Sequence, residues 1–138
     1  MVQSKGEKPM VDITALDGTV LHIDDNSVTI VSGPLPHDPP NRSYVTGPAP
    51  AVIETAEDAA HLVGRLPRKV ALVKLTRLNN TAVWIKGAAV TLVKAPNTDD
   101  IPPGEHVGAV LYIGGHHQAV VEDVPAVRAA VNAHGGNV

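Results

Sequence analysis

The stretch VDITALDGTVLHIDDNSVTIV at residues 11–31 is repeated, with changes, as VKLTRLNNTAVWIKGAAVTLV at residues 73–93. The two stretches align without a gap. The identical pairs are Val11/Val73, Thr14/Thr76, Leu16/Leu78, Thr19/Thr81, Ile23/Ile85, Val28/Val90, Thr29/Thr91 and Val31/Val93. An internal match of this length indicates that one structural unit is used twice in the chain.

Each stretch predicts a β-hairpin followed by a third strand. Val11 and Ile13 alternate with polar neighbours, which is the pattern of a half-buried strand. Asp17-Gly18 then predicts a type I′ turn, in which both central residues have positive φ. Asn79-Asn80 stands at the same place in the second stretch, so we expect the two hairpins to have equivalent turns.

Proline-rich segments at residues 33–43 and 95–105 follow the third strands and predict surface loops, because proline cannot donate to a sheet ladder. Two more strands and a short helix are expected after each loop. The expected helix boundaries are Thr55 to Gly64 and Asp123 to Gly135. The prediction is therefore a mainly β fold with short helices (α+β), built as a tandem duplicated β-β-β-loop-β-β-α module with a pseudo-twofold relation.

These patterns also predict the domain boundaries. The expected segments are an N-terminal arm at 1–10, a first repeat module at 11–64, a linker at 65–70, a second repeat module at 71–134 and a C-terminal tail at 135–138. One unit of this size is marginally stable alone, so the two modules are expected to bury their apolar faces on each other. The alternative is that each module binds its own copy of a partner.

Composition limits the class of protein. The chain has 138 residues, no cysteine and no phenylalanine, which excludes disulfides and cysteine-based zinc sites. Residues 1–10 are polar and no apolar run is long enough to span a bilayer, so we expect no membrane insertion and a cytoplasmic or virion-associated protein.

The sequence also predicts no catalytic residue, cofactor or metal site. The seven histidines lack metal-ligand spacing, and the pairs Asp24-Asp25 and Asp99-Asp100 lack the ligand pattern of a calcium loop. Recognised nucleophile, phosphate-binding and dinucleotide-binding motifs are missing as well. We therefore expect a protein that is not an enzyme.

Charge is distributed unevenly although the net charge is only −3. The acidic residues are concentrated before residue 65 and the basic residues after it. Lys74 and Arg77 belong to a basic segment that could form a stripe on one sheet face, so the alternative function is that of a small nucleic-acid-binding or regulatory protein that uses the basic second half. The favoured function is assembly through protein–protein contacts. We expect these to be head-to-tail contacts between copies, or contacts of the basic half with an acidic protein surface.

Trp84 is the only tryptophan and alternates with Val83 and Ile85, which are expected to point inward. Its ring should lie on the opposite sheet face, covered either by the other module or by a partner, because tryptophan is enriched at binding hot spots. The candidate interaction residues are Trp84, Lys74, Arg77 and Lys86.

Leu75, Thr76, Arg77, Leu78 and Asn79, with the later strand QAVVE and the helix starting at Val124, resemble the FlbD/SwrD family of small flagellar-motility proteins. The resemblance covers Leu72 to about Val131, and the first half is a weaker second copy. It implies a small accessory protein without an active site. We expect a non-catalytic structural protein in a larger assembly, such as a phage capsid or tail accessory subunit or a flagellar accessory protein.

Overall fold

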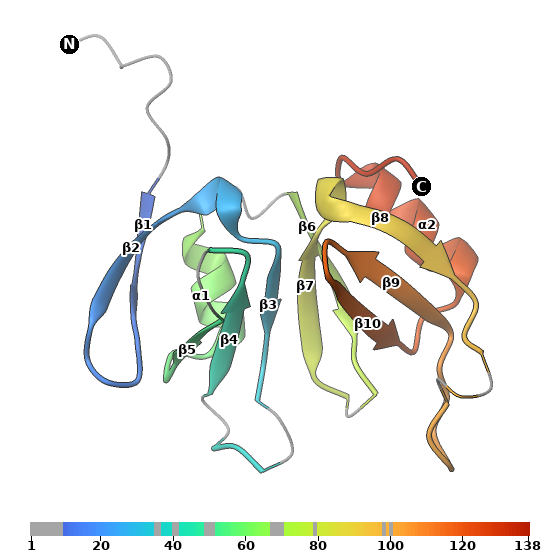
Figure 1. The fold of residues 1–138 in the computed structure, drawn as a ribbon, viewed down its shortest axis with the longest axis horizontal. Helices are drawn as coiled ribbons and strands as arrows, with labels where there is room; N and C mark the ends of the chain where they lie inside the picture. Colours follow the sequence, from blue (N-terminus) through green and yellow to red (C-terminus); the bar gives the residue numbers. More distant parts are fainter. Residues whose placement is uncertain are drawn as a thin grey trace, which may run out of the picture.

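The computed structural model describes residues 10–34, 37–39, 42–48, 52–66, 71–78, 80–97, 99 and 101–138. Within these residues the fold is mainly β, with ten strands in three sheets and two short α-helices (Figure 1). The prediction of a mainly β, α+β fold is confirmed. Most of the predicted N-terminal arm and residues 67–70 of the predicted linker lie outside the described residues.

The order of elements is the same in the two halves of the chain. The first half contains β1 (Met10–Thr14), β2 (Val20–Asp24), the 3-10 helix η1 (Asp25–Ser27), β3 (Ile30–Ser32), β4 (Ser43–Thr46), β5 (Ile53–Thr55) and α1 (Ala59–Arg65). The second half contains β6 (Leu72–Thr76), β7 (Ala82–Lys86), the 3-10 helix η3 (Gly87–Ala89), β8 (Val90–Lys94), β9 (Ala109–Ile113), β10 (His116–Val120) and α2 (Val124–Ala133). An origin of this order by duplication stays a prediction.

The two leading hairpins also share their register. Val11 lies opposite Ile23 in the β1–β2 hairpin, and the aligned residue Val73 lies opposite Ile85 in β6–β7. Alternating apolar residues place one face of each hairpin in a core, since successive side chains point to opposite faces of a strand.

The turns of these hairpins correct one detail of the prediction. Gly18 has φ 90° and Asn80 has φ 66°, whereas Asp17 does not have positive φ. Gly18 N–H donates to the Ala15 carbonyl at 3.0 Å, so Leu16 and Asp17 are the central residues of the turn. The predicted type I′ turn is wrong, because a longer loop with a single left-handed residue closes this hairpin.

The pairing of strands into three sheets defines the architecture. The largest sheet has the strand order β5-β4-β3-β7-β6 and joins the two halves of the chain through antiparallel pairing of β3 with β7. The hairpin β1–β2 and the three strands β10-β9-β8 form the other two sheets. We call the β3–β7 pairing the joint; it lies near the middle of the molecule in Figure 1.

Strand pairing between the two halves does not follow a twofold axis. A twofold axis between the halves would pair β8 with β2 in the way that β3 pairs with β7. Among the described strands, β8 pairs only with β9, and β2 pairs only with β1. The pseudo-twofold relation expected from the sequence is therefore not found.

Two apolar clusters, one for each half, form the interior. The first core consists of Val11, Ile13, Ile23, Val28, Val31, Val45, Ile53, Ala59, Leu62, Val63, Leu66 and Leu72. The second core consists of Ile30, Val73, Leu75, Val83, Ile85, Val90, Ala109, Leu111, Ile113, Val120, Val127 and Val131. Leu72 and Ile30 are exchanged between the halves, since each residue packs in the core of the other half.

The two helices agree unequally with the sequence prediction. Asp58, and not Thr55, caps α1, and Gly64 lies inside the helix. Thr55 instead ends β5, where its hydroxyl accepts a hydrogen bond from Glu57 N–H. The boundaries of α2 are close to those expected, because Asp123 is its N-cap and Gly135 follows it with φ 93°.

The left-handed turn residues allow a direct test of the equivalence of the hairpins. We expect Asn80→Gly to stabilise the protein by about 0.5 kcal/mol, since glycine adopts positive φ without steric cost. We expect Gly18→Ala to destabilise it by about 1–2 kcal/mol through backbone strain alone, because a Cβ at Gly18 would meet no atom within 4 Å. Urea denaturation measures both effects, and a destabilising Asn80→Gly or a neutral Gly18→Ala would contradict the equivalence.

Candidate protein-interaction site

The joint contains two of the four residues that the sequence singled out for interaction, Trp84 and Lys86. Trp84 lies opposite Val31 of β3 on one side and opposite Lys74 of β6 on the other. Its side chain is half-buried and packs against the first core, although Trp84 belongs to the second half. Of the two arrangements expected for this tryptophan, the described contacts are those with the other half of the same chain.

Lys74 and Arg77 lie close to the joint without forming an open basic stripe. The Lys74 ammonium lies 5.7 Å from the centre of the Trp84 ring, a cation–π geometry. Arg77 donates to the Gly33 carbonyl at 3.3 Å. Burial lowers the pKa of Arg77, because removal from water disfavours the charged form.

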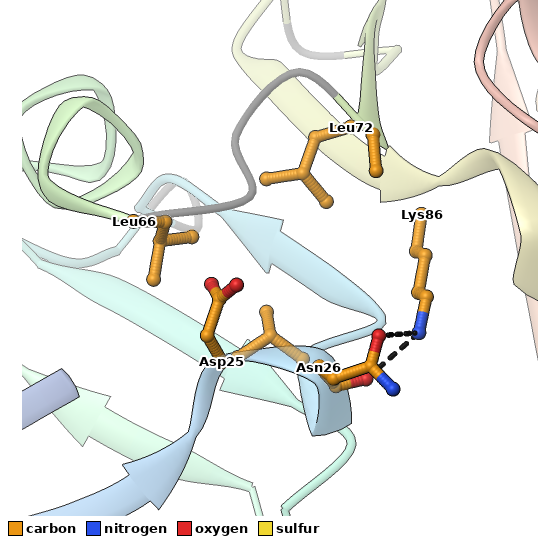
Figure 2. Close-up of a pocket in the computed structure, with 7 residues that line it drawn as sticks. Asp25, Asn26, Leu66, Leu72 and Lys86 are labelled. Carbon is orange, nitrogen blue, oxygen red and sulfur yellow. Dashed lines mark hydrogen bonds between the residues drawn. The ribbon is translucent and has the colours of Figure 1, made fainter. Parts of the chain in front are cut away.

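Lys86 joins the two halves through both its backbone and its side chain. Its N–H donates to the Thr29 carbonyl at 2.8 Å. Its ammonium group donates to the backbone and side-chain oxygens of Asn26 at 2.8 and 2.9 Å, as the dashed lines in Figure 2 show. The three hydrogen bonds attach the end of β7 to the segment that precedes β3.

A small cavity lies beside these bonds. It is lined by Asp25, Asn26, Val28, Leu66, Ala71, Leu72 and Lys86 and has a volume of about 20 Å³. The Asp25 carboxylate is buried and points toward Leu66 and Leu72 (Figure 2). The volume is about that of one water molecule, so the cavity is a packing feature of the joint and has no room for an organic ligand.

Arg65, which precedes Lys74 and Arg77 in the sequence, is paired within the first half. Its guanidinium donates two hydrogen bonds to the Glu57 carboxylate, at 2.7 and 2.6 Å. The bidentate contact lowers the pKa of Glu57, and His61 adds a third contact at 2.6 Å. Arg68 and Lys69 lie outside the described residues.

An apolar groove of about 570 Å³ runs along the first half. Its lining residues are Ala15, Leu16, Asp17, Leu21, His22, Ile23, Pro48, Val52, Ile53 and Glu54. Leu16 is 45% exposed and Val52 is 47% exposed at this groove. Large apolar side chains with this exposure are typical of surfaces that another protein covers, when they are grouped as they are here.

Sequence reasoning missed the exposed apolar residues at the strand edges, chiefly Met10 and Leu92, which are 54% and 48% exposed. A signal was present in the repeat. Met10 aligns with Leu72 and Leu92 aligns with Ile30, so both halves carry apolar residues at positions that are buried in only one of them.

Two of the histidines, His22 and His61, lie beside carboxylates, those of Asp12 and Glu57. His22 lies 2.5 Å from the Asp12 carboxylate, and both side chains are exposed. The described residues include no group of three or more histidine, aspartate or glutamate side chains that could hold a metal ion. In the same part of the chain no helix is long and apolar enough to cross a membrane.

Comparisons of the chain with models of known protein families, with curated proteins and with solved structures find no match. The resemblance to the FlbD/SwrD family therefore depends on the quoted residues alone.

We expect Trp84→Ala to destabilise the fold by about 2 kcal/mol, less than for a fully buried tryptophan, because the side chain is half-buried in the joint. Trp84→Phe, the control, should cost less because it keeps most of the apolar contact. Thermal and urea unfolding measure both. An unchanged stability together with lost association would instead assign Trp84 to an interface.

The Glu57–Arg65 pair predicts a pH-dependent contribution to stability. Because the pKa of Glu57 is lowered by folding, the pair stabilises the protein above the unfolded-state pKa of about 4.3 and this contribution is lost as pH falls through the lower folded-state pKa. Glu57→Gln should therefore cost about 1 kcal/mol at pH 7 and little at the acid end. The matched control is Glu54→Gln, since Glu54 makes only a 3.7 Å contact with Arg42.

Proposed function

We propose that the protein is a non-catalytic structural protein that acts through protein–protein contacts in a larger assembly, including contacts between its own copies. The observation that carries this proposal is the exposure of Met10 on the β1–β2 hairpin and of Leu92 on the edge strand β8. An open strand edge with exposed apolar side chains is a surface for pairing with another chain.

The manner in which the two halves meet supports the same proposal. They join by antiparallel strand pairing at β3–β7, with apolar side chains exchanged between the cores. A unit that already binds its neighbour within the chain in this way is suited to bind further units in the same way.

Within this function, the setting we propose is a phage capsid or tail accessory subunit or a flagellar accessory protein, cytoplasmic or associated with the virion. The resemblance of residues 72–131 to the flagellar family supports the flagellar setting. The uneven charge, acidic before residue 65 and basic after it, supports contacts between unlike halves of neighbouring copies.

Nucleic-acid binding is the second candidate, and the placement of the basic residues favours protein contacts over it. Lys74 and Lys86 contact groups of the joint, and Arg65 is paired with Glu57. Trp84, the residue best suited to stack on a base, is half-buried against the first core. Single-strand binders keep such rings open on a basic groove.

We expect the purified full-length protein to self-associate as its concentration rises, and association to weaken between about 0.05 and 0.5 M salt because exposed charges are screened. Sedimentation velocity across concentration and salt series measures both effects. A protein that stays monomeric throughout, while a labelled single-stranded oligonucleotide binds in a salt-dependent manner, would replace this proposal with nucleic-acid binding.

A further inference from the structure

Two edge strands, β2 and β8, correspond in sequence to the two strands of the joint but are not paired with each other in the described chain. The residues of β2 align with those of β7, and the residues of β3 align with the last three residues of β8, Leu92 to Lys94. β3 and β7 pair with each other, whereas β2 and β8 are edge strands within the described sheets. The β1–β2 hairpin lies at the left end of Figure 1 and β8 lies in the right-hand half.

The edge strands keep the local geometry of their paired counterparts. The Thr29 hydroxyl donates to the Thr46 carbonyl at 3.2 Å, and the aligned Thr91 hydroxyl donates to the Tyr112 carbonyl at the same distance. In each case the residue after the threonine, Ile30 or Leu92, lies opposite the residue whose carbonyl accepts the bond. β8 thus keeps this contact of β3, although its ladder with β9 also has a register shift between Val90 and Leu92.

Exposure differs between the aligned positions in the way expected for a missing neighbour. Ile30 is 8% exposed in the second core, whereas its counterpart Leu92 is 48% exposed. Leu72 is 8% exposed in the first core, whereas its counterpart Met10 is 54% exposed. The two residues that the halves exchange at the joint therefore have apolar counterparts that nothing in the described chain covers.

We propose that the protein assembles head to tail, with β8 of one copy pairing antiparallel with β2 of the next copy as β3 pairs with β7 within the chain. The register follows from that of the joint, where Ile30, Val31 and Ser32 lie opposite Ile85, Trp84 and Val83. The corresponding pairs between copies are Leu92 with Ile23, Val93 with His22 and Lys94 with Leu21.

This arrangement buries both exposed apolar residues. Leu92 enters the first core of the next copy as Ile30 enters the second core, and Met10 covers the second core of the preceding copy as Leu72 covers the first. Burial of a large apolar side chain stabilises association in proportion to the area removed from water.

The main-chain hydrogen bonds follow the same template. At the joint Lys86 N–H donates to Thr29, and bonded pairs alternate along an antiparallel ladder, so Val31 and Trp84 form the next bonded pair. Their counterparts Val93 and His22 supply the main-chain groups between copies. Ile23/Leu92 and Leu21/Lys94 are then non-bonded pairs, in which the Cβ atoms approach most closely.

The contact uses different surfaces of the two partners, so it is heterologous and extends into a ring or an open array. The inference rests on the proposed function and specifies its contact: the partner is a second copy, and the surfaces are the edges of β2 and β8.

Cysteine cross-linking tests the register, because the natural chain contains no cysteine. In the full-length Leu21→Cys/Lys94→Cys variant, oxidation should link copies into dimers and longer species on a non-reducing gel, since the two residues form a non-bonded pair between copies. The matched control is Val20→Cys/Lys94→Cys. Val20 is 49% exposed but points to the opposite face of β2, so it should cross-link much less.

A second pair of variants tests the apolar contact without oxidation. Leu92→Lys should weaken self-association at least about tenfold, because a lysine replaces the side chain that enters the next core. The control is Ile101→Lys, which changes another exposed apolar residue of the same half, 41% exposed and outside the strands, and should leave association unchanged. Circular dichroism verifies that both variants fold.

The outcomes separate this inference from the proposed function. Preferential cross-linking at Leu21/Lys94 together with the loss caused by Leu92→Lys supports the strand pairing. Self-association with equal cross-linking in both cysteine variants, or equal behaviour of the two lysine variants, overturns the pairing and leaves the proposed assembly function standing. A wild-type protein that remains monomeric overturns self-assembly itself.

Discussion

The antiparallel pairing of β3 with β7 is the interaction on which the rest of the structure depends. It converts two small sets of strands into a five-stranded sheet, and it brings Ile30 into the second core and Leu72 into the first. Aliphatic residues, chiefly valine, fill both cores, and neither contains phenylalanine. With side chains of this size, exchange across the joint lets each half bury apolar surface that its own strands leave uncovered.

The order of strands and helices along the chain, the positions of the hairpins and the second helix could be predicted because local chemistry determines them. Alternation at Val11 and Ile13 fixes the inward face, and Asp123 with Gly135 sets the ends of α2. The start of α1 was misplaced because Thr55 and Asp58 are both capping residues, and sequence does not tell which lies in the last strand. The predicted pseudo-twofold relation is not found, because a sequence repeat identifies equivalent units but does not give the symmetry operation that relates them.

The contacts within the candidate site could also not be predicted from the sequence. Trp84 was identified by its rarity and alternation, but its covering by the first core depends on the joint, which is a contact between distant parts of the chain. The basic residues formed a group in sequence, yet Arg65 points to Glu57 and Lys86 to Asn26. Exposure at Met10 and Leu92 could not be read from residue type, because aligned residues of the same character are buried elsewhere.

The exchange of Ile30 and Leu72 also determines how the molecule comes apart. Loss of packing in one half withdraws a side chain from the core of the other, so we expect the two halves to share a single cooperative unfolding transition. A break in the backbone between α1 and β6 would leave the fragments held together by β3 and β7. The two units that the sequence repeat defines are therefore expected to unfold as one.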